Sequence, residues 1–181
     1  MVEEQDWIEA YKEIGKLMEA IPEVKHVDLW HEQIDFLPEE YPWPPGSVFI
    51  EVNVSDTSST GLKVQDLNAE VTVFFVLDTL ADTYMKSATQ DIAFEFGQVL
   101  KKIHKALHGN SGKNFSAMNR RGIFRQPAPQ YLMAYKQVFN CIIRDMSAMD
   151  EPGEATLTKA TVNTSSPPIL PETPMYPLAN E

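Results

Sequence analysis

The sequence is poor in cysteine, in basic residues and in long apolar runs, and each scarcity excludes a class of protein. Cys141 is the only cysteine, so no disulfide can form within the chain. The apolar stretch from Val71 to Leu77 is far shorter than the ~20 residues that a membrane-spanning helix needs. We therefore expect a fold that relies on its own apolar core.

The scarcity of basic residues gives the chain a strong negative charge. It has 15 Lys and Arg against 26 Asp and Glu, a net charge of −11. Such a surface repels nucleic-acid phosphates, which disfavours sequence-specific DNA binding. A ring-shaped oligomer with a negative inner surface could still surround DNA without gripping it. The first residues are acidic where a secretory signal would be basic and then apolar, so we expect a cytoplasmic protein.

The length and composition predict one folded domain followed by an arm. Of the 181 residues, 43% are apolar, which suffices for one core, and the chain is too short for two full domains. Residues 149–181 hold six of the thirteen prolines, the single basic residue Lys159 and no periodic apolar pattern. We predict one domain over residues 1–148 and an extended or disordered Pro/Thr-rich arm over residues 149–181.

Apolar spacing predicts two helices. In the first, apolar residues recur at steps of three and four after the expected N-cap Asp6; they are Trp7, Tyr11, Ile14, Met18 and Ile21. The second begins near Ser87 and ends before Gly109, with a stripe formed by Ile92, Phe96, Val99, Leu100, Ile103 and Leu107. Each stripe needs an apolar surface to cover, so we expect both helices to pack against a sheet.

Four segments have the composition or the two-residue alternation of strands. They are residues 24–30, 48–54, 69–77 and 131–145, with a stiff proline-rich loop over residues 37–46 and a hairpin turn over residues 55–61. In the last strand, one face holds Met133, Tyr135, Phe139, Cys141 and Ile143. The predicted fold is α+β, in the order α-β-β-β-α-β, with a mostly antiparallel four-stranded sheet and helices packed on one face.

Candidate reactive residues are few, and ordinary structural roles explain them. His104 and His108 stand one helical turn apart, but no glutamate accompanies them as in a zinc-protease helix, so a solvated face is favoured. His31 beside Glu32 is typical of a surface loop. Cys141 lies among apolar residues and is expected to be packed and inert. We predict no catalytic, cofactor-binding or metal-binding residue, and no enzyme activity.

Two features favour contacts with other molecules. Arg120, Arg121 and Arg125 form the one basic cluster of an acidic chain, and they are either solvated or meet an acidic or phosphate partner. Phe74 and Val76 make the second face of their strand as apolar as the first, so something must cover them. The cover is either the first helix or the proline loop of the same chain, or a neighbouring subunit.

Several short motifs, taken in order, carry a resemblance to a known family. They are Trp30-His31-Glu32-Gln33 at a strand end, the proline-rich approach to Val48–Val52, and Val71–Val76 in the next strand. A long amphipathic helix and an Arg-containing segment follow, and the final strand ends at Arg144-Asp145. Over roughly residues 5–148, the chain resembles the tail-completion or tail-terminator proteins of long-tailed bacteriophages and related phage-derived particles.

The resemblance implies a structural role in a virion. Members of that family assemble as rings, commonly hexamers, which stop the growth of the tail tube and offer a docking face to the head. The implied partners are copies of the chain itself, the tail tube protein and a head-completion or neck protein, with DNA passing through the lumen without sequence-specific binding. The implied location is the virion tail or neck, and the host cytoplasm during assembly. The long arm departs from the compact family pattern, and we expect it to order against a neighbouring subunit.

Two other functions are compatible with the sequence. One is another neck or head-tail connector component, and the other is a small bacterial adaptor that binds proteins through the arm. Neighbouring genes would separate them, because a terminator gene is expected beside tail-tube and head-completion genes.

Overall fold

A five-stranded sheet forms the centre of the molecule. The structure is a computed structural model, and it describes residues 5–35, 43–78, 83–128 and 132–149. The strands are β1 (His26–Leu29), β2 (Ser47–Gly61), β3 (Val64–Asp78), β4 (Asn119–Gln126) and β5 (Leu132–Asp145). They lie in the order β1-β2-β3-β5-β4, and all neighbours are antiparallel except β1 and β2, which are parallel.

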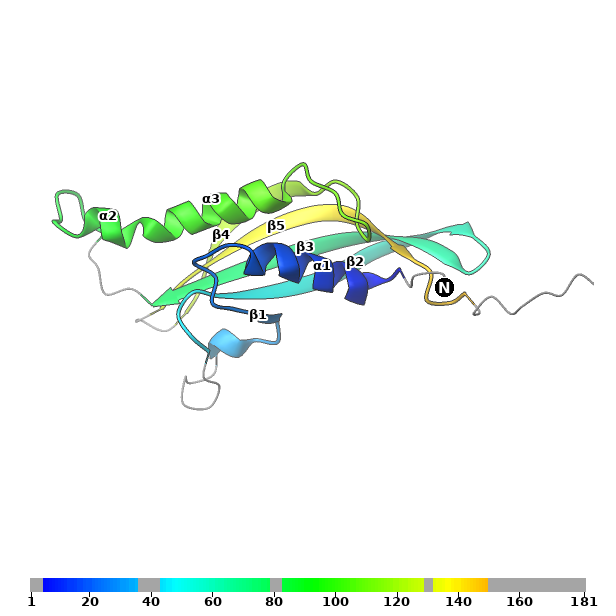
Figure 1. Ribbon diagram of the computed structural model, residues 1–181, viewed down its shortest axis with the longest axis horizontal. Coiled ribbons are helices and arrows are strands. Elements are labelled where there is room, and N and C mark those ends of the chain that lie inside the picture. The colour runs from blue at the N-terminus through cyan, green and yellow to red at the C-terminus, as the bar shows by residue number, and fades with distance from the viewer. Residues whose placement is uncertain (1–4, 36–42, 79–82, 129–131, 150–181) are drawn as a thin grey trace, which may run out of the picture. The chain divides into compact units, whose positions relative to one another are not determined.

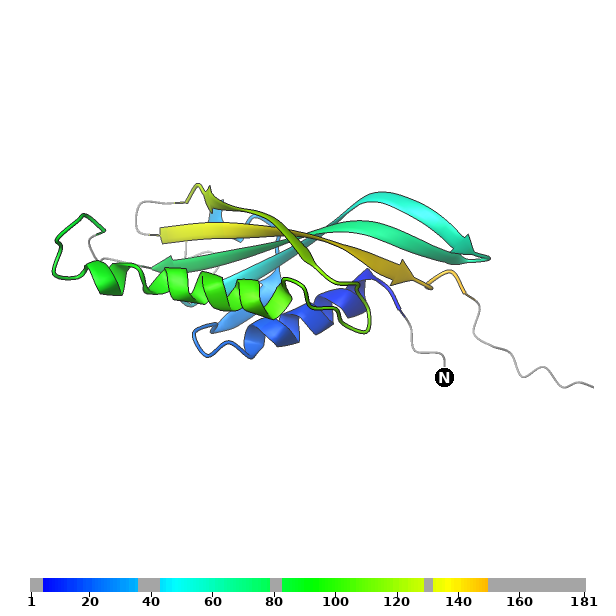
Figure 2. The same ribbon diagram turned by 90° about the horizontal axis from the view of Figure 1, so that it is seen from above.

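The helices cover one face of this sheet. They are α1 (Trp7–Glu19), α2 (Gln90–Ala93) and α3 (Glu95–Leu107), with a 3-10 turn η1 (Gln33–Asp35) after β1. Figures 1 and 2 show α1 and α3 on the same side of the sheet, and Figure 1 shows η1 on the other side. The predicted α+β fold with a mostly antiparallel sheet is confirmed, but the predicted number of four strands is wrong, since the described residues form a sheet of five.

The strand that the sequence did not predict is β4. Its residues contain only two apolar side chains, Ile123 and Phe124, and these are adjacent, so the alternation typical of a half-buried strand is absent. β4 forms because its backbone pairs with that of β5, from Ala134 to Asn140. Hydrogen bonding of the backbone, rather than burial of side chains, therefore accounts for this strand.

The antiparallel hairpin of β2 and β3 is confirmed, but it is longer than predicted. Residues 55–61, expected as the turn, continue β2 and pair with β3 as far as Gly61 opposite Val64. From Asn53 onward the side chains of β2 are exposed. Figures 1 and 2 show this half of the hairpin projecting past the end of α1. Because both faces of β2 are exposed there, its sequence has no apolar alternation that could reveal this part of the strand.

The single long helix predicted from Ser87 is broken at Phe94 into α2 and α3. Ile92, expected on the buried stripe, is 59% exposed, whereas the stripe residues on α3 are buried. Figure 1 shows that α2 lies beyond the end of the sheet. Ile92 therefore has no sheet to cover, and the buried stripe begins at Phe96.

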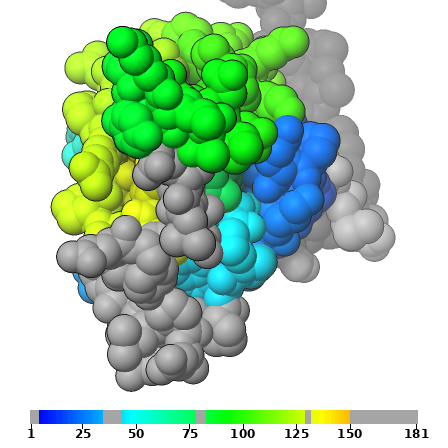
Figure 3. All heavy atoms as spheres, turned by 90° about the vertical axis from the view of Figure 1, so that its left-hand side faces the viewer, coloured from blue at the N-terminus to red at the C-terminus, as the bar shows by residue number. Residues whose placement is uncertain are grey.

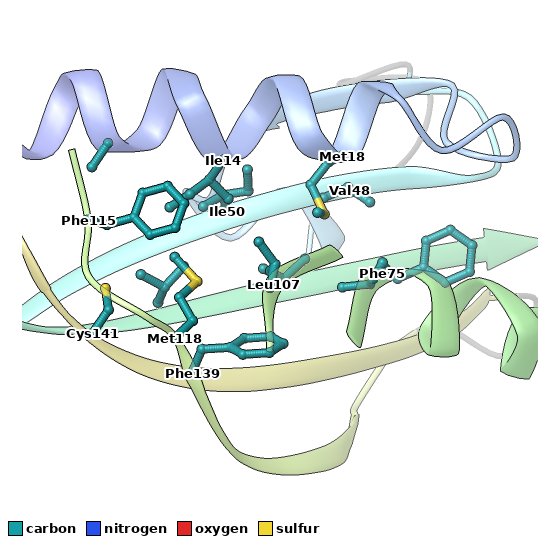
Figure 4. Packing of buried hydrophobic residues seen from close by; sticks show 14 of the residues in the cluster. Ile14, Met18, Val48, Ile50, Phe75, Leu107, Phe115, Met118, Phe139 and Cys141 are labelled. Carbon is teal, nitrogen blue, oxygen red and sulfur yellow. The ribbon is translucent and has the colours of Figure 1, made fainter. Parts of the chain in front are cut away.

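The main core lies between the helices and the sheet. The helix α1 begins at its predicted N-cap, where Asp6 Oδ1 accepts the Glu9 N–H at 2.8 Å. Figure 4 shows Ile14 and Met18 of α1 pointing towards the sheet. The predicted inner face of β5 is confirmed; Phe139, Cys141 and Ile143 are buried in this core, and Met133 and Tyr135 pack against it.

The only cysteine is part of this core. Burial raises the pKa of the Cys141 thiol to about 11. The thiol is therefore protonated at neutral pH, as expected for a packed and unreactive side chain.

A carboxylate on α1 anchors the loop between α3 and β4. Glu13 accepts hydrogen bonds from the N–H groups of Lys113 and Asn114 and from the side-chain amide of Asn114. A Cβ at Gly112 would collide with the same carboxylate, so a larger residue there would displace Glu13 from this position. The loop residue Phe115 is held in the core as a result (Figure 4).

A second, smaller core covers the other face of the sheet, at the end where β2 begins. Its buried members are Ile34, Phe49, Phe74, Val76 and Ala134, and Trp30 and Trp43 pack against them. The ring of Trp30 lies parallel to that of Phe74, with centroids 4.0 Å apart. The cover that Phe74 and Val76 require therefore comes from the same chain, with Trp30, Ile34 and Trp43 among the residues that supply it.

The turn after β1 brings Trp30 into this position. Gln33 is fully buried, and its Oε1 accepts the N–H of His31 at 2.8 Å, which closes the turn. Glu32 has a left-handed backbone with a φ of 67°. The motif from Trp30 to Gln33 thus has a structural role in building the second core.

Parts of the prediction lie outside the described residues. Of the predicted arm, only Met149 is described, and of the proline loop only residues 43–46. Within the described ranges, no helix is long and apolar enough to cross a membrane.

Candidate subunit interface

The three arginines of the basic cluster all lie on β4, but their surroundings differ. Arg120 is half-buried, and its Nη1 donates to Gln137 Oε1 at 3.0 Å. Gln137 is fully buried and its Nε2 donates to the carbonyl of Leu100 on α3 at 2.8 Å. Arg120 is therefore tied to the core of its own chain, whereas Arg121 and Arg125 are exposed and available to a partner.

The link through Gln137 was not predicted from the sequence. The available signal was a polar residue at an apolar position, because Gln137 falls between Tyr135 and Phe139 on the inner face of β5. A buried side-chain amide needs hydrogen-bond partners, and Arg120 and Leu100 supply them.

The two histidines of α3 lie next to this arginine. Their rings stack with centroids 4.7 Å apart, and His108 Nδ1 accepts the N–H of Arg120 at 3.1 Å. Burial lowers the pKa of His104, and the charges of Arg120 and His108 lower it further. In the part of the chain that the structure describes, no group of three His, Cys, Asp or Glu could hold a metal.

The pair His31 and Glu32 lies in the turn between β1 and η1, on the opposite side of the sheet from α3 (Figure 1). His31 Nδ1 lies 3.0 Å from the carbonyl of Leu29. A hollow of about 550 Å³ beside α3 is lined by Phe75, Phe96 and Lys102 among others, and neither His31 nor His104 lines it.

Phe74 and Val76 were candidates for contact with a neighbouring subunit, and the structure corrects this. They are 3% and 0% exposed, respectively, because the second core encloses them. The alternative in which the same chain covers them is the one that the structure shows, so neither side chain is available to a partner.

The sheet instead offers two edges where, among the residues that the structure describes, no strand pairs with the outward backbone groups. At one edge, β1 pairs only with residues 47–50 of β2. The last contact is from the Trp30 N–H to the Ile50 carbonyl at 2.8 Å. From residue 51 to residue 61, no described strand lies beside β2 on that side. We call these residues the β2 edge.

The second free edge is on β4, the last strand at the other side of the sheet. Its first residues are occupied, because Gly109 donates to the carbonyl of Met118 and Arg120 donates to His108. From residue 121 to residue 126, no described segment pairs with the outer side of β4. We call these residues the β4 edge.

The two edges differ in charge and share exposed apolar side chains. The β4 edge carries Arg121 and Arg125 and no acid, whereas the β2 edge carries Glu51 and Asp56 and no base. Each edge also exposes an apolar residue on the face that the helices cover: Ile123, 45% exposed, opposite Gln137 of β5, and Val54, 43% exposed, opposite Ala69 of β3. Unpaired edges of this length are sites where another strand can be added.

A separate group of exposed apolar residues surrounds α2. Tyr84, Met85, Ile92 and Phe94 are each at least 47% exposed. Figure 3 views the molecule from this end, where the green segment that includes α2 stands at the surface. Clusters of this kind mark contact surfaces.

No model of a protein family matches the chain, and no curated protein matches it either. Among solved structures, one match is a chain described as "Virion of native gene transfer agent (GTA) particle". The two chains are 10% identical, the match covers 72% of this chain and 84% of that chain, and the TM-score is 0.44. A likeness this distant carries no argument about function.

Proposed function

We propose that the chain is a non-enzymatic structural protein of a virion or phage-derived particle, acting as a tail terminator or tail-completion ring. Copies of the chain would close on the end of the tail tube and join it to the neck below the head. The observation that carries this proposal is the pair of free sheet edges, of opposite charge, at the two sides of one sheet.

Edges at opposite sides of a sheet favour a head-to-tail assembly. Like edges repel each other, since two β4 edges would bring four arginines together and two β2 edges would bring four carboxylates together. Association of unlike edges uses a different surface on each partner, and such contacts form a ring if the rotation closes. A ring is the shape that the sequence resemblance implies.

The charge of the chain supports the same proposal. A ring of subunits that each carry a net charge of −11 repels the phosphates of DNA in its lumen, so DNA would pass without being held. The proposed partners are copies of the chain, the tail tube protein and a head-completion or neck protein, and the proposed location is the virion tail or neck.

Deleting the gene from the genome that encodes the chain tests this function. Electron microscopy is expected to show heads filled with DNA but not joined to tails, and tails of irregular length. Supplying the wild-type gene in trans restores joined particles with tails of uniform length. Normal particles from the deletion strain would contradict the proposal.

A further inference from the structure

We infer that the β4 edge of one copy pairs with the β2 edge of the next copy, in antiparallel orientation and in a single register. The occupant of each edge is therefore a second copy of this chain. This inference rests on the proposed function, because it names the contact that would close the ring.

The orientation follows from the topology of the sheet. Passing from β2 to β4 crosses three antiparallel pairs, β2 with β3, β3 with β5 and β5 with β4, so β2 and β4 run in opposite directions. When the next copy continues the sheet with its helices on the same face, its β2 lies antiparallel to β4. No strand has to reverse and no helix has to cross the sheet.

The backbone groups that point outward restrict the register. The Ile50 carbonyl accepts from Trp30 and so points away from β3, and alternation gives Val52 and Val54 the same direction. On β4, the Arg120 N–H donates to His108 and so points away from β5. A bulge inserts one residue after Arg120, and beyond it the alternation turns Ile123 and Arg125 outward.

One register satisfies all of these directions. It places Ile123 opposite Val54 and Arg125 opposite Val52, so that the outward-pointing backbone N–H and C=O groups of the two strands face each other and can form hydrogen bonds. The exposed side chains of Ile123 and Val54 then meet on the face that the helices cover. In the same register, Arg121 lies opposite Asp56.

The irregularities of the two strands also coincide in this register. β2 has a register shift between Val54 and Asp56, and β4 has one between Arg120 and Gly122. The second shift of β2, between Ser59 and Gly61, lies beyond the residues that face the β4 edge in this register. Each shift adds one residue, so the strands stay aligned on both sides of the two bulges. Other registers place one bulge against a regular strand and interrupt the pairing.

The register has a geometric consequence that suits a closed ring. Within one copy, Phe124 of β4 is opposite Lys136 of β5, which is opposite Phe74 of β3, which is opposite Phe49 of β2. Phe124 is therefore at the same height in the sheet as Phe49 of its own copy, but in the proposed register it pairs with Asn53 of the next copy. The next copy is therefore displaced by four residues, about 13 Å along the strand, over four strand spacings of about 19 Å in all. Strands in such a ring tilt by about 35° from the ring axis, which is within the range of roughly 35–45° found in closed barrels.

Disulfide cross-linking tests the register directly. Asn53 and Phe124 form a predicted pair between copies at a position without backbone hydrogen bonds, where Cα atoms are about 4.5 Å apart and a disulfide is feasible. Within one copy they lie on strands three spacings apart, about 14 Å, which is beyond the ~7 Å limit for a disulfide. Any bond between them must therefore join two copies.

The experiment uses the full chain with Asn53→Cys and Phe124→Cys combined, oxidised under non-denaturing conditions and analysed on non-reducing gels. We expect a ladder of cross-linked species that ends at the number of subunits in the ring. The first control is each single variant alone, in which Cys141 is the only other thiol. The second control combines Phe124→Cys with Ser58→Cys, because residue 58 is five residues away from the predicted partner of Phe124. Neither control is expected to give a ladder.

Other outcomes overturn the inference, and they are distinguishable from failure of the proposed function. Cross-linked dimers from one single variant would show that like edges pair. Oligomers seen by light scattering without the Asn53–Phe124 cross-link would exclude this interface while leaving the proposed ring intact. A chain that neither oligomerises nor cross-links would contradict both. Circular dichroism and thermal melting confirm that every variant is folded.

Discussion

Replacing Phe74 by alanine tests how the second face of the sheet is covered. Phe74 is 3% exposed, its ring is parallel to that of Trp30 at 4.0 Å, and Phe49 lies opposite it on β2. Removing a buried phenylalanine costs about 3–5 kcal/mol. The aromatic pair with Trp30 contributes about 0.5–1.5 kcal/mol beyond burial, so we expect the loss to be about 4 kcal/mol.

Urea unfolding measures this loss at a protein concentration where the chain is monomeric. With a slope of about 2 kcal/mol per molar urea, a loss of about 4 kcal/mol lowers the midpoint by about 2 M. The matched control is Phe94→Ala, because Phe94 is 47% exposed and lies at the start of α3. Its midpoint is expected to fall by about 0.5 M or less.

The refuting result is equally specific. If Phe74→Ala leaves the urea midpoint of the monomer unchanged and only weakens oligomers, the second core does not form in the isolated chain. Phe74 would then contact a neighbouring subunit, and the enclosure by Trp30 would be incorrect.

Three further predictions concern stability. Gly46→Ala is expected to destabilise the chain by at least about 2 kcal/mol in urea unfolding, because Gly46 has a φ of 88° and a Cβ would lie 2.7 Å from the carbonyl of Glu23. Gly97→Ala is expected to stabilise the chain by about 0.5–1 kcal/mol, because Gly97 lies in a helix and a Cβ there would meet nothing within 4 Å. If Gly97→Ala were the more destabilising of the two, the backbone geometry would be contradicted. Glu13→Ala removes the carboxylate that accepts three hydrogen bonds from the loop before β4, and we expect it to cost about 2 kcal/mol and to speed amide exchange in that loop. Unchanged exchange would refute the anchoring role. The folded state lowers the pKa of His104, so the unfolded state takes up the proton at a higher pH than the folded state does. The free energy of unfolding that the neutral His104 provides is therefore fully present above pH ~6.5 and falls as the pH drops through that value. Thermal midpoints at neutral and acidic pH should therefore differ less in His104→Gln than in the wild type, and an equal difference would exclude this histidine as a cause.

The parts of the fold that were predicted correctly are those in which the pattern of apolar residues follows the burial of the side chains. The alternation of β2 and β3 and the apolar face of β5 match the contact of these strands with the core. On α1 the predicted stripe residues Ile14 and Met18 are buried, whereas Trp7, predicted on the same stripe, is 39% exposed. The N-cap Asp6 was predicted because its side chain acts locally, on the N–H of Glu9 three residues away.

The parts that were missed are held by backbone pairing or by distant partners. β4 and the outer half of the hairpin have few buried side chains, so their sequences carry no period. The break at Phe94 depends on where the sheet ends, which is a property of other strands (Figure 1). The apolar period of α2 and α3 alone could not place that end.

Only the basic part of the candidate interface was predicted, because its counterpart depends on the arrangement of distant strands. Composition identified the arginines of β4 as an unusual feature of an acidic chain. It could not identify the β2 edge as their counterpart, because strand order and the short length of β1 leave that edge free. Nor could composition show that Arg120 is hydrogen-bonded to the buried Gln137 of its own chain, whereas Arg121 is exposed and available to a partner.

The central proposal is that one copy is completed by the next through edges of opposite charge. Its most direct test is the molar mass of the full chain by light scattering, for the wild type, Asp56→Arg, Arg121→Glu and the two changes combined. The account predicts an oligomeric wild type, a shift towards monomer in each single variant, and recovery of the wild-type mass when both charges are exchanged. A monomeric wild type at every concentration, or single variants with unchanged mass, would contradict it.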